Sequence, residues 1–323
     1  MSSLPPVIIL NSASAEGVRG RRRWLCVFNV IGTLTSLGFS TFVYVVSADM
    51  GKAVAGFSMV GLCFASVRIW NASLKVLPSS LAVQFFLRAA VVSVLLAIAM
   101  ESVQLKNFDP DFQSKTWVFP IAFTAGFAEE VAKLAVVLVG LCLTQLPAAL
   151  ALSSGTIFHC VPTSGCIRFW SVLIESPRGL AMAGIAAGLG FMTSENLEYF
   201  ATPFMFLPTL SCLVFAALRI FLNLHPLLTG LSAARLAHAL WHPGGPRSVS
   251  PGKVVRAILP SVGIHGMYDF GLMFSQSDPF DKRLDLVMAI VSLLLIPGTA
   301  IFLVYTYRRL PLVADRTPLL ETL

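Results

Sequence analysis

Two glutamates and a lysine interrupt an apolar stretch of the sequence, in the run Gly126-Phe-Ala-Glu129-Glu130-Val-Ala-Lys133. On a helix, Glu129 and Lys133 share one face at a spacing of four residues, and Glu130 reaches Lys133 at a spacing of three. A structural ion pair would account for the lysine and one glutamate. Because adjacent carboxylates cannot both ionise cheaply away from water, the remaining glutamate is a candidate general base.

Further along the chain, Glu195 and Asn196 follow an apolar segment with several glycines, three of which lie close before them. These glycines, at positions 184, 188 and 190, permit close approach of a neighbouring helix. We therefore expect Glu195 and Asn196 to face another polar segment.

Further polar residues that could take part in chemistry are Arg219, His225, Thr229, His265 and Asp269. His265 and Asp269 lie four residues apart, so the carboxylate could orient the imidazole, or both could address one metal or water. A lone histidine such as His225 is more often a packed residue than a catalyst. An ionisable side chain in hydrocarbon costs at least about 2.5 to 3.5 kcal/mol, so we expect these clusters to converge in one site.

The elements that position these residues are predicted to be membrane-spanning helices. The chain is 56% hydrophobic and 12% charged, with a mean hydropathy of +0.80, which excludes an ordinary soluble domain. A span needs about 20 largely apolar residues. We predict an all-α, polytopic transmembrane helical bundle with eight spans, or nine. The candidate segments are Trp24 to Val46, Val54 to Leu74, Leu81 to Val103, Trp117 to Leu143, Arg178 to Phe200, Phe204 to Leu222, His225 to Trp241, Lys253 to Phe274 and Leu286 to Tyr305.

The net charge of +7 is explained by membrane topology, so we expect no nucleic-acid partner. Basic residues flank the first and last apolar segments: Arg19, Arg21, Arg22, Arg23, Arg308 and Arg309. The positive-inside rule places both ends in the cytoplasm, which requires an even number of crossings. We therefore expect the segment His225 to Trp241 to be re-entrant or merged with its neighbour. We divide the chain into a disordered cytoplasmic N-terminus (1–20), a membrane domain (21–310) and a cytoplasmic tail (311–323).

The motifs, taken in order, resemble those of PrsW-type membrane proteases. They are Glu-Glu-x-x-Lys, Gly-Phe-x-x-x-Glu-Asn-x-x-Tyr, Arg with a downstream His-x-x-x-Thr-Gly, and His-Gly-x-x-Asp, between about Gly126 and Leu272. That family is related to the CAAX prenyl protease and bacteriocin-processing superfamily, but Phe191-x-x-x-Glu195 here replaces a Phe-x-x-x-His motif. The resemblance implies a helical bundle with a water-filled polar cavity, a protease-like core at about 117–274, and hydrolysis of peptide bonds near or within the bilayer.

The resemblance also implies a set of site residues. Those expected to act in catalysis are Glu129, Glu130, Glu195, His225, His265 and Asp269, and those expected to support the cavity are Lys133, Asn196, Arg219 and Thr229. The two adjacent glutamates would supply the base, and His265 with Asp269 would hold the water or stabilise the oxyanion. Glu130, His225 and His265 could hold a divalent metal such as Zn²⁺. Glutamate and histidine can also activate water without a metal, and the sequence slightly favours that alternative.

The C-terminal segment Asp315-Arg-Thr-Pro-Leu319-Leu320 resembles an acidic dileucine sorting motif. It predicts adaptor proteins as partners and delivery to endosomes or lysosomes. The other expected partners are the lipid bilayer and a membrane-anchored protein substrate.

Two other classes of function compete with an intramembrane protease. Buried carboxylates and histidines also build proton relays, so a proton-coupled transporter or channel is the first alternative. No internal repeat of the kind typical of transporters is visible in the sequence. The second alternative is a catalytically inactive relative that binds membrane clients, against which the retained Glu129, Glu130, His265 and Asp269 count.

Overall fold

The computed structural model describes most of the chain, and every regular element in that part is a helix. The described residues are 15–74, 77, 79–105, 115–153, 176–201, 208–221, 223–241, 249–277 and 282–311. No strand occurs among them, in agreement with the predicted all-α class.

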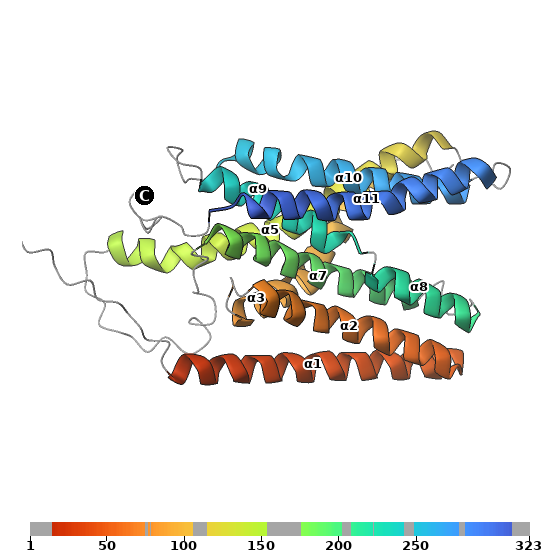
Figure 1. Ribbon diagram of the computed structural model, residues 1–323, viewed down its shortest axis with the longest axis horizontal. Coiled ribbons are helices and arrows are strands. Elements are labelled where there is room, and N and C mark those ends of the chain that lie inside the picture. The colour runs from red at the N-terminus through yellow and green to blue at the C-terminus, as the bar shows by residue number, and fades with distance from the viewer. Residues whose placement is uncertain are drawn as a thin grey trace, which may run out of the picture.

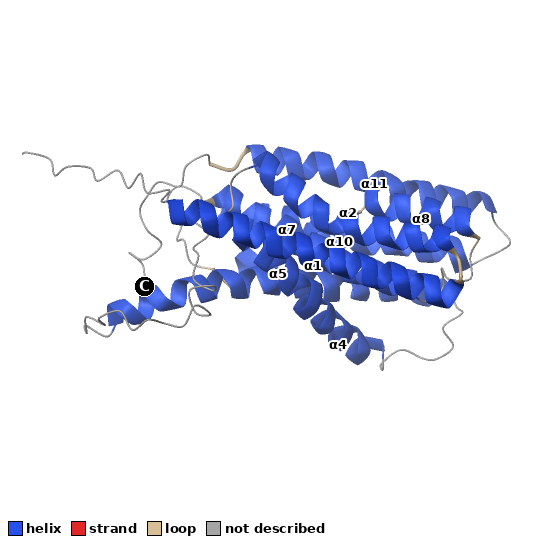
Figure 2. Cartoon of the chain, turned by 90° about the horizontal axis from the view of Figure 1, so that it is seen from below, coloured by secondary structure: helices blue, strands red, loops and turns tan. Residues whose placement is uncertain are grey.

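The helices form an elongated bundle in which the longest elements run along a common direction (Figure 1). Their bounds are α1 Ala15–Ser47, α2 Met50–Leu74, α3 Ser79–Arg88, α4 Val94–Leu105, α5 Lys115–Ser153, α7 Pro177–Ala201, α8 Thr209–Phe221, α9 His225–Leu240, α10 Pro251–Ser277 and α11 Lys282–Arg308. A short π-helical turn, η1 (Ala89–Ser93), joins α3 to α4. Seen from below, α4 leans away from the bundle (Figure 2).

Helix α7 forms the centre of the core. It contacts α2, α3, α5 and α9, and every residue from Leu180 to Thr193 is buried. Small side chains make this possible, because alanine and glycine let neighbouring backbones approach closely. A Cβ at Gly188 would lie 2.5 Å from the carbonyl oxygen of His225 in α9. The sequence-based expectation that these glycines permit close helix approach is thus met on α7.

The outer surface of the bundle is apolar, as expected for a protein whose solvent is lipid. Val45 on α1 is 74% exposed and Ile301 on α11 is 70% exposed. Three segments of the described helices are long and apolar enough to cross a membrane: Asn29–Ser47, Leu81–Val103 and Leu286–Arg308. The chain is an integral membrane protein, and the number of eight crossings stays a prediction.

Helices α8 and α9 follow one another across the bundle, with a break between Phe221 and His225 (Figure 1). Helix α9 is about 24 Å long at 1.5 Å per residue, which is short of the roughly 30 Å hydrocarbon core. That the segment from His225 is re-entrant or merged with its neighbour stays a prediction. The break also places the first residue of α9 in the interior of the bundle.

Two boundaries differ from the predicted ones. Helix α1 begins at Ala15, so residues 15–20 are helical where a disordered segment was expected. Helix α5 continues to Ser153, beyond the predicted end at Leu143. At α1 the helix begins before the apolar stretch, because helix formation does not require every residue to be apolar, whereas crossing a bilayer does. At α5 the added residues 144–153 are rich in alanine and leucine, which favour a helix. The dileucine motif at Asp315, Leu319 and Leu320 lies outside the described residues.

Candidate active site

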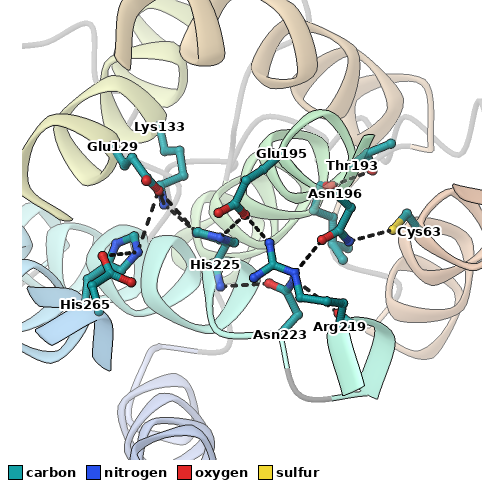
Figure 3. Close-up of polar contacts among 12 residues, drawn as sticks. Cys63, Glu129, Lys133, Thr193, Glu195, Asn196, Arg219, Asn223, His225 and His265 are labelled. Atoms are coloured by element: carbon teal, nitrogen blue, oxygen red, sulfur yellow. Dashed lines mark hydrogen bonds and ion pairs between the residues drawn. The ribbon is translucent and has the colours of Figure 1, made fainter. Parts of the chain in front are cut away.

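Four helices contribute ionisable side chains to a common polar cluster. Glu129 comes from α5, Glu195 from α7, His225 from α9 and His265 from α10, and their side chains point toward one another (Figure 3). The structure thus brings together segments separated by up to about 135 residues of sequence. The predicted convergence of the polar clusters is found in the geometry.

The break before α9 determines where His225 lies. The backbone N–H of His225 donates to Asn223 Oδ1 at 3.0 Å, which satisfies one of the free donors at a helix start. Pro226 occupies the first turn of α9, where the missing N–H costs no helical hydrogen bond. The start of a helix carries a partial positive charge, which favours the carboxylates that gather there.

The two ring nitrogens of His225 face different partners. Nε2 lies 2.5 Å from Glu195 Oε2, so this carboxylate holds one side of the ring. Nδ1 lies 3.6 Å from Glu129 Oε2 and 2.9 Å from Lys133 Nζ. A proton on Nε2 leaves the Nδ1 lone pair available on the side of Glu129.

The ring of His265 is held in the same way by a different carboxylate. Its Nδ1 lies 3.1 Å from Glu130 Oε1, while Nε2 lies 3.6 Å from Glu129 Oε2 and 3.5 Å from Asp269 Oδ2. The rings of His225 and His265 meet edge to face, with centroids 5.2 Å apart. Both histidines therefore present one nitrogen to Glu129 and give the other to a second carboxylate.

Lys133 is fully buried and is paired chiefly with Glu130. Its Nζ lies 2.6 Å from Glu130 Oε1 and 3.4 Å from Glu129 Oε2, above the ring of Phe191 at 4.5 Å from the centroid. The structural ion pair expected from the sequence is thus present, and Glu130 is its acidic partner. Glu129 is the carboxylate that faces both histidines.

A second ion pair supports Glu195 from the far side. Arg219 Nη2 lies 2.8 Å from Glu195 Oε2, and Arg219 Nε donates to Asn196 Oδ1 at 2.7 Å. Asn196 in turn approaches Cys63 Sγ of α2 at 3.7 Å. Arg219 thus contacts both Glu195 and Asn196, whereas Thr229 is buried with no hydrogen bond to its hydroxyl from the described residues. The role of these residues in supporting the cavity stays a prediction.

Asn223 and Cys63 were not singled out in the sequence. Asn223 could have been found from its position two residues before a histidine-proline pair, which is a common start of a helix. Cys63 gave no such signal, because it lies in an apolar helix far from every polar motif.

The donor set at the centre fits a divalent metal ion. One ligand atom each from Glu129, His225 and His265 lies within 4.8 Å of the other two, and two histidines with a glutamate are a common set for catalytic zinc. In metal sites the second nitrogen of a ligating histidine is usually held by a carboxylate or carbonyl. Glu195 and Glu130 occupy those places here. The sequence-based ligand set named Glu130, and the geometry assigns that place to Glu129.

Lys133 opposes a metal, because its ammonium contacts His225 Nδ1 and Glu129 Oε2. A cation at the centre and this ammonium would compete for the same two donors. Glu130 Oε1, the nearest partner of Lys133, is outside the donor set, so the ammonium keeps a partner of its own.

A polar cavity of about 40 Å³ adjoins the two histidines. Its walls include Glu195, Arg219, His225, His265 and Asp269. A water needs roughly 10 to 15 Å³ of such space, so the cavity can hold one to a few waters beside the donor set. Asp269 forms part of the wall next to His265.

A family model described as "PrsW family intramembrane metalloprotease" matches residues 77–296, about two thirds of the chain. The match includes every residue of the polar cluster and begins well before the motifs from which the resemblance was drawn. The comparisons with curated proteins and with solved structures gave no match. The wider relation to CAAX prenyl proteases stays an expectation.

Proposed function

This chain belongs to the PrsW family of intramembrane metalloproteases, and we propose that it hydrolyses peptide bonds of membrane-anchored proteins with water activated at Glu129, His225 and His265. The observation that supports this most strongly is the arrangement of the two histidines. Each turns one nitrogen to Glu129 and has its other nitrogen held by a separate carboxylate.

Glu129, His225 and His265 are the proposed ligands of a divalent metal, with zinc the best match to nitrogen and carboxylate donors. When bound, such a metal makes water a stronger nucleophile and polarises the scissile carbonyl. Glu195 and Glu130 fix the tautomers of the two histidines, so that each ring offers a lone pair on the side of Glu129. The family description as metalloproteases favours this over the metal-free alternative.

Asp269 is the proposed general base. Its carboxylate lines the cavity and lies 3.5 Å from His265 Nε2, so it can accept a proton from water next to the donor set. Glu195 is less suited to that role, because both His225 and Arg219 already occupy its Oε2. Glu130 is less suited as well, because it neutralises Lys133.

The test is cleavage of a panel of membrane-anchored reporters by purified protein in lipid nanodiscs, together with its metal content. We expect Glu129→Gln and His265→Ala to lose both bound metal and cleavage, and Asp269→Asn to lose cleavage while keeping the metal. Glu198→Gln is the matched control, since this exposed carboxylate of α7 lies outside the cavity lining. Wild type that is active with no bound metal and indifferent to a chelator would overturn the metal centre.

A proton-coupled transporter is the second candidate, and the break between α8 and α9 favours it. Discontinuous helices in transporters place half-helix ends at a substrate or ion site, and His225 begins such a half-helix. The discriminating result is a proton or solute flux in proteoliposomes that Glu129→Gln abolishes, with no cleavage of any reporter. An inactive client-binding relative would show neither activity and would still retain membrane proteins.

Delivery to endosomes or lysosomes through Asp315, Leu319 and Leu320 is a separate proposal, supported by the motif alone. Replacing both leucines with alanine should move a fluorescently tagged chain to the cell surface. An unchanged distribution would remove the sorting adaptors from the list of partners.

A further inference from the structure

A second cavity, of about 520 Å³, lies between α9, α10 and α11. Four of its lining residues carry a full positive charge: Arg235, Lys253, Arg256 and Arg309. Among the described residues, none that lines it is acidic. Several like charges around one cavity without a carboxylate raise the local potential, which favours binding of an anion.

This basic cavity is distinct from the metal-type cluster. Arg235 lies ten residues after His225 on α9, about 15 Å along the helix, and Arg256 lies nine residues before His265 on α10, about 13 Å. The cavity is found where α9 ends, α10 begins and α11 ends, at the end of the bundle from which α1 also starts (Figure 1). The positive-inside rule assigns that end to the cytoplasm.

Two of the arginines are held in place before any ligand arrives. Arg235 Nη2 donates to the backbone carbonyl of Arg256 at 3.1 Å, which fixes it between α9 and α10. Its Nε is buried and has no hydrogen-bond partner in the described part of the chain. The guanidinium of Arg309 lies over the ring of Tyr305, 4.2 Å from the centroid. Fixed guanidinium groups suit phosphate oxygens, which accept two parallel hydrogen bonds.

The surface beside the cavity is apolar and exposed. Leu259, one turn after Arg256 on α10, is 63% exposed. On α11, Ile301 is exposed one turn before Tyr305. The cavity therefore lies where the helix surface changes from apolar to charged, which is the level of the lipid headgroups.

We propose that this basic cavity binds the phosphate headgroup of an anionic membrane lipid, whose acyl chains lie along Leu259 and Ile301. A soluble phosphate compound would meet the same cations and would gain nothing from the apolar surface. The two sources therefore differ in whether acyl chains add to the affinity.

The test is the Kd of purified full-length protein for dioctanoyl phosphatidylinositol 4-phosphate, dioctanoyl phosphatidylcholine and free inositol 1,4-bisphosphate. We expect the anionic lipid to bind on the order of tenfold more tightly than either other probe. Arg256→Gln and Lys253→Gln should each raise its Kd on the order of tenfold, as expected for one lost charged hydrogen bond. Arg308→Gln is the matched control, because this exposed arginine lies on the same end of α11 and does not line the cavity.

Each alternative outcome is decisive. Equal binding of the free headgroup and the anionic lipid would overturn the proposal of a lipid ligand and assign the cavity to a soluble phosphate compound. Equal binding of the two lipids, or an unchanged Kd in both Arg256→Gln and Lys253→Gln, would overturn the anion site. Arg256 is exposed, so its variant is expected to fold, and Lys253→Gln provides an independent check.

Discussion

Replacing Gly188 with alanine should impair the polar cluster although no polar side chain is replaced. In Gly188→Ala, the new Cβ would lie 2.5 Å from the carbonyl oxygen of His225 and 2.6 Å from Cα of Pro226. Ordinary contact begins at 3.4 Å. Because both obstacles are backbone atoms, no side chain can rotate away, and α7 and α9 must separate by about 0.9 Å.

That separation acts directly on His225, the first residue of α9. Its Nε2 lies 2.5 Å from Glu195 Oε2 on α7 and its Nδ1 lies 3.6 Å from Glu129 Oε2 on α5, so a shift of α9 alters both distances. A misplacement of about 1 Å in a catalytic centre can cost on the order of 100-fold in rate. Overpacking costs about 1 to 3 kcal/mol of stability, which leaves a folded protein with impaired activity.

The assay measures cleavage of a membrane-anchored reporter, the Kd for Zn²⁺ and the Tm of each variant in nanodiscs. Gly263→Ala is the matched control: it makes the same change on α10, two residues before His265, where a Cβ meets no atom within 4 Å. We expect the control to keep wild-type activity and to be slightly more stable, because alanine favours a helix over glycine. A folded Gly188→Ala protein with wild-type cleavage and Zn²⁺ affinity would refute the proposed dependence of the site on α7–α9 packing.

Three other predictions concern single contacts. Lys133→Met should lower stability by about 3 to 5 kcal/mol, because it leaves Glu130 buried without its cation, and a Tm equal to that of wild type would argue against this pairing. Asn223→Ala should cost about 1 kcal/mol of stability through loss of the hydrogen bond to the His225 N–H and should weaken Zn²⁺ binding. A lowered Tm with unchanged Zn²⁺ affinity would show that this hydrogen bond does not position the site. Asp49, between α1 and α2, accepts hydrogen bonds from the Thr209 hydroxyl and the N–H groups of Gly51 and Lys52, and the Thr209 bond chiefly lowers the pKa of Asp49. Its contribution to stability is therefore present above the ordinary Asp pKa and lost as pH falls below it, so thermal unfolding of Asp49→Asn should show a smaller loss of Tm on acidification than wild type.

Convergence of the polar residues could be predicted from the sequence because each of them is costly in a lipid environment. Glu129, Glu195, His225 and His265 lie on four different apolar segments, and the cheapest way to keep them from lipid is to bring them together. That reasoning depends on composition and spacing alone. It required no knowledge of how the helices pack.

Which of the two glutamates, Glu129 or Glu130, pairs with Lys133 and which faces both histidines could not be predicted. Both reach Lys133 on a helix, at spacings of four and three residues, so the sequence permits either as the partner of the lysine. Their directions differ by about 100° around the helix axis, and the choice depends on how α5 is rotated against α10. A Cβ at Gly126 would lie 3.0 Å from the Gly266 backbone N, so close packing at this pair fixes that rotation only once the two helices meet.

The charges of the cluster give an independent reason to expect a divalent cation. Four carboxylates, those of Glu129, Glu130, Glu195 and Asp269, face two permanent cations, Lys133 and Arg219. With both histidines neutral, as metal ligation requires, the cluster carries an excess of two negative charges. Buried charge of that size must be neutralised, because unpaired ions are costly away from water. A divalent metal would balance it in full, whereas without a metal two protons must be taken up, for which the histidines and Asp269 are the available sites. Removal of the metal should therefore be accompanied by proton uptake. Protons and the metal should compete for the cluster as the pH falls.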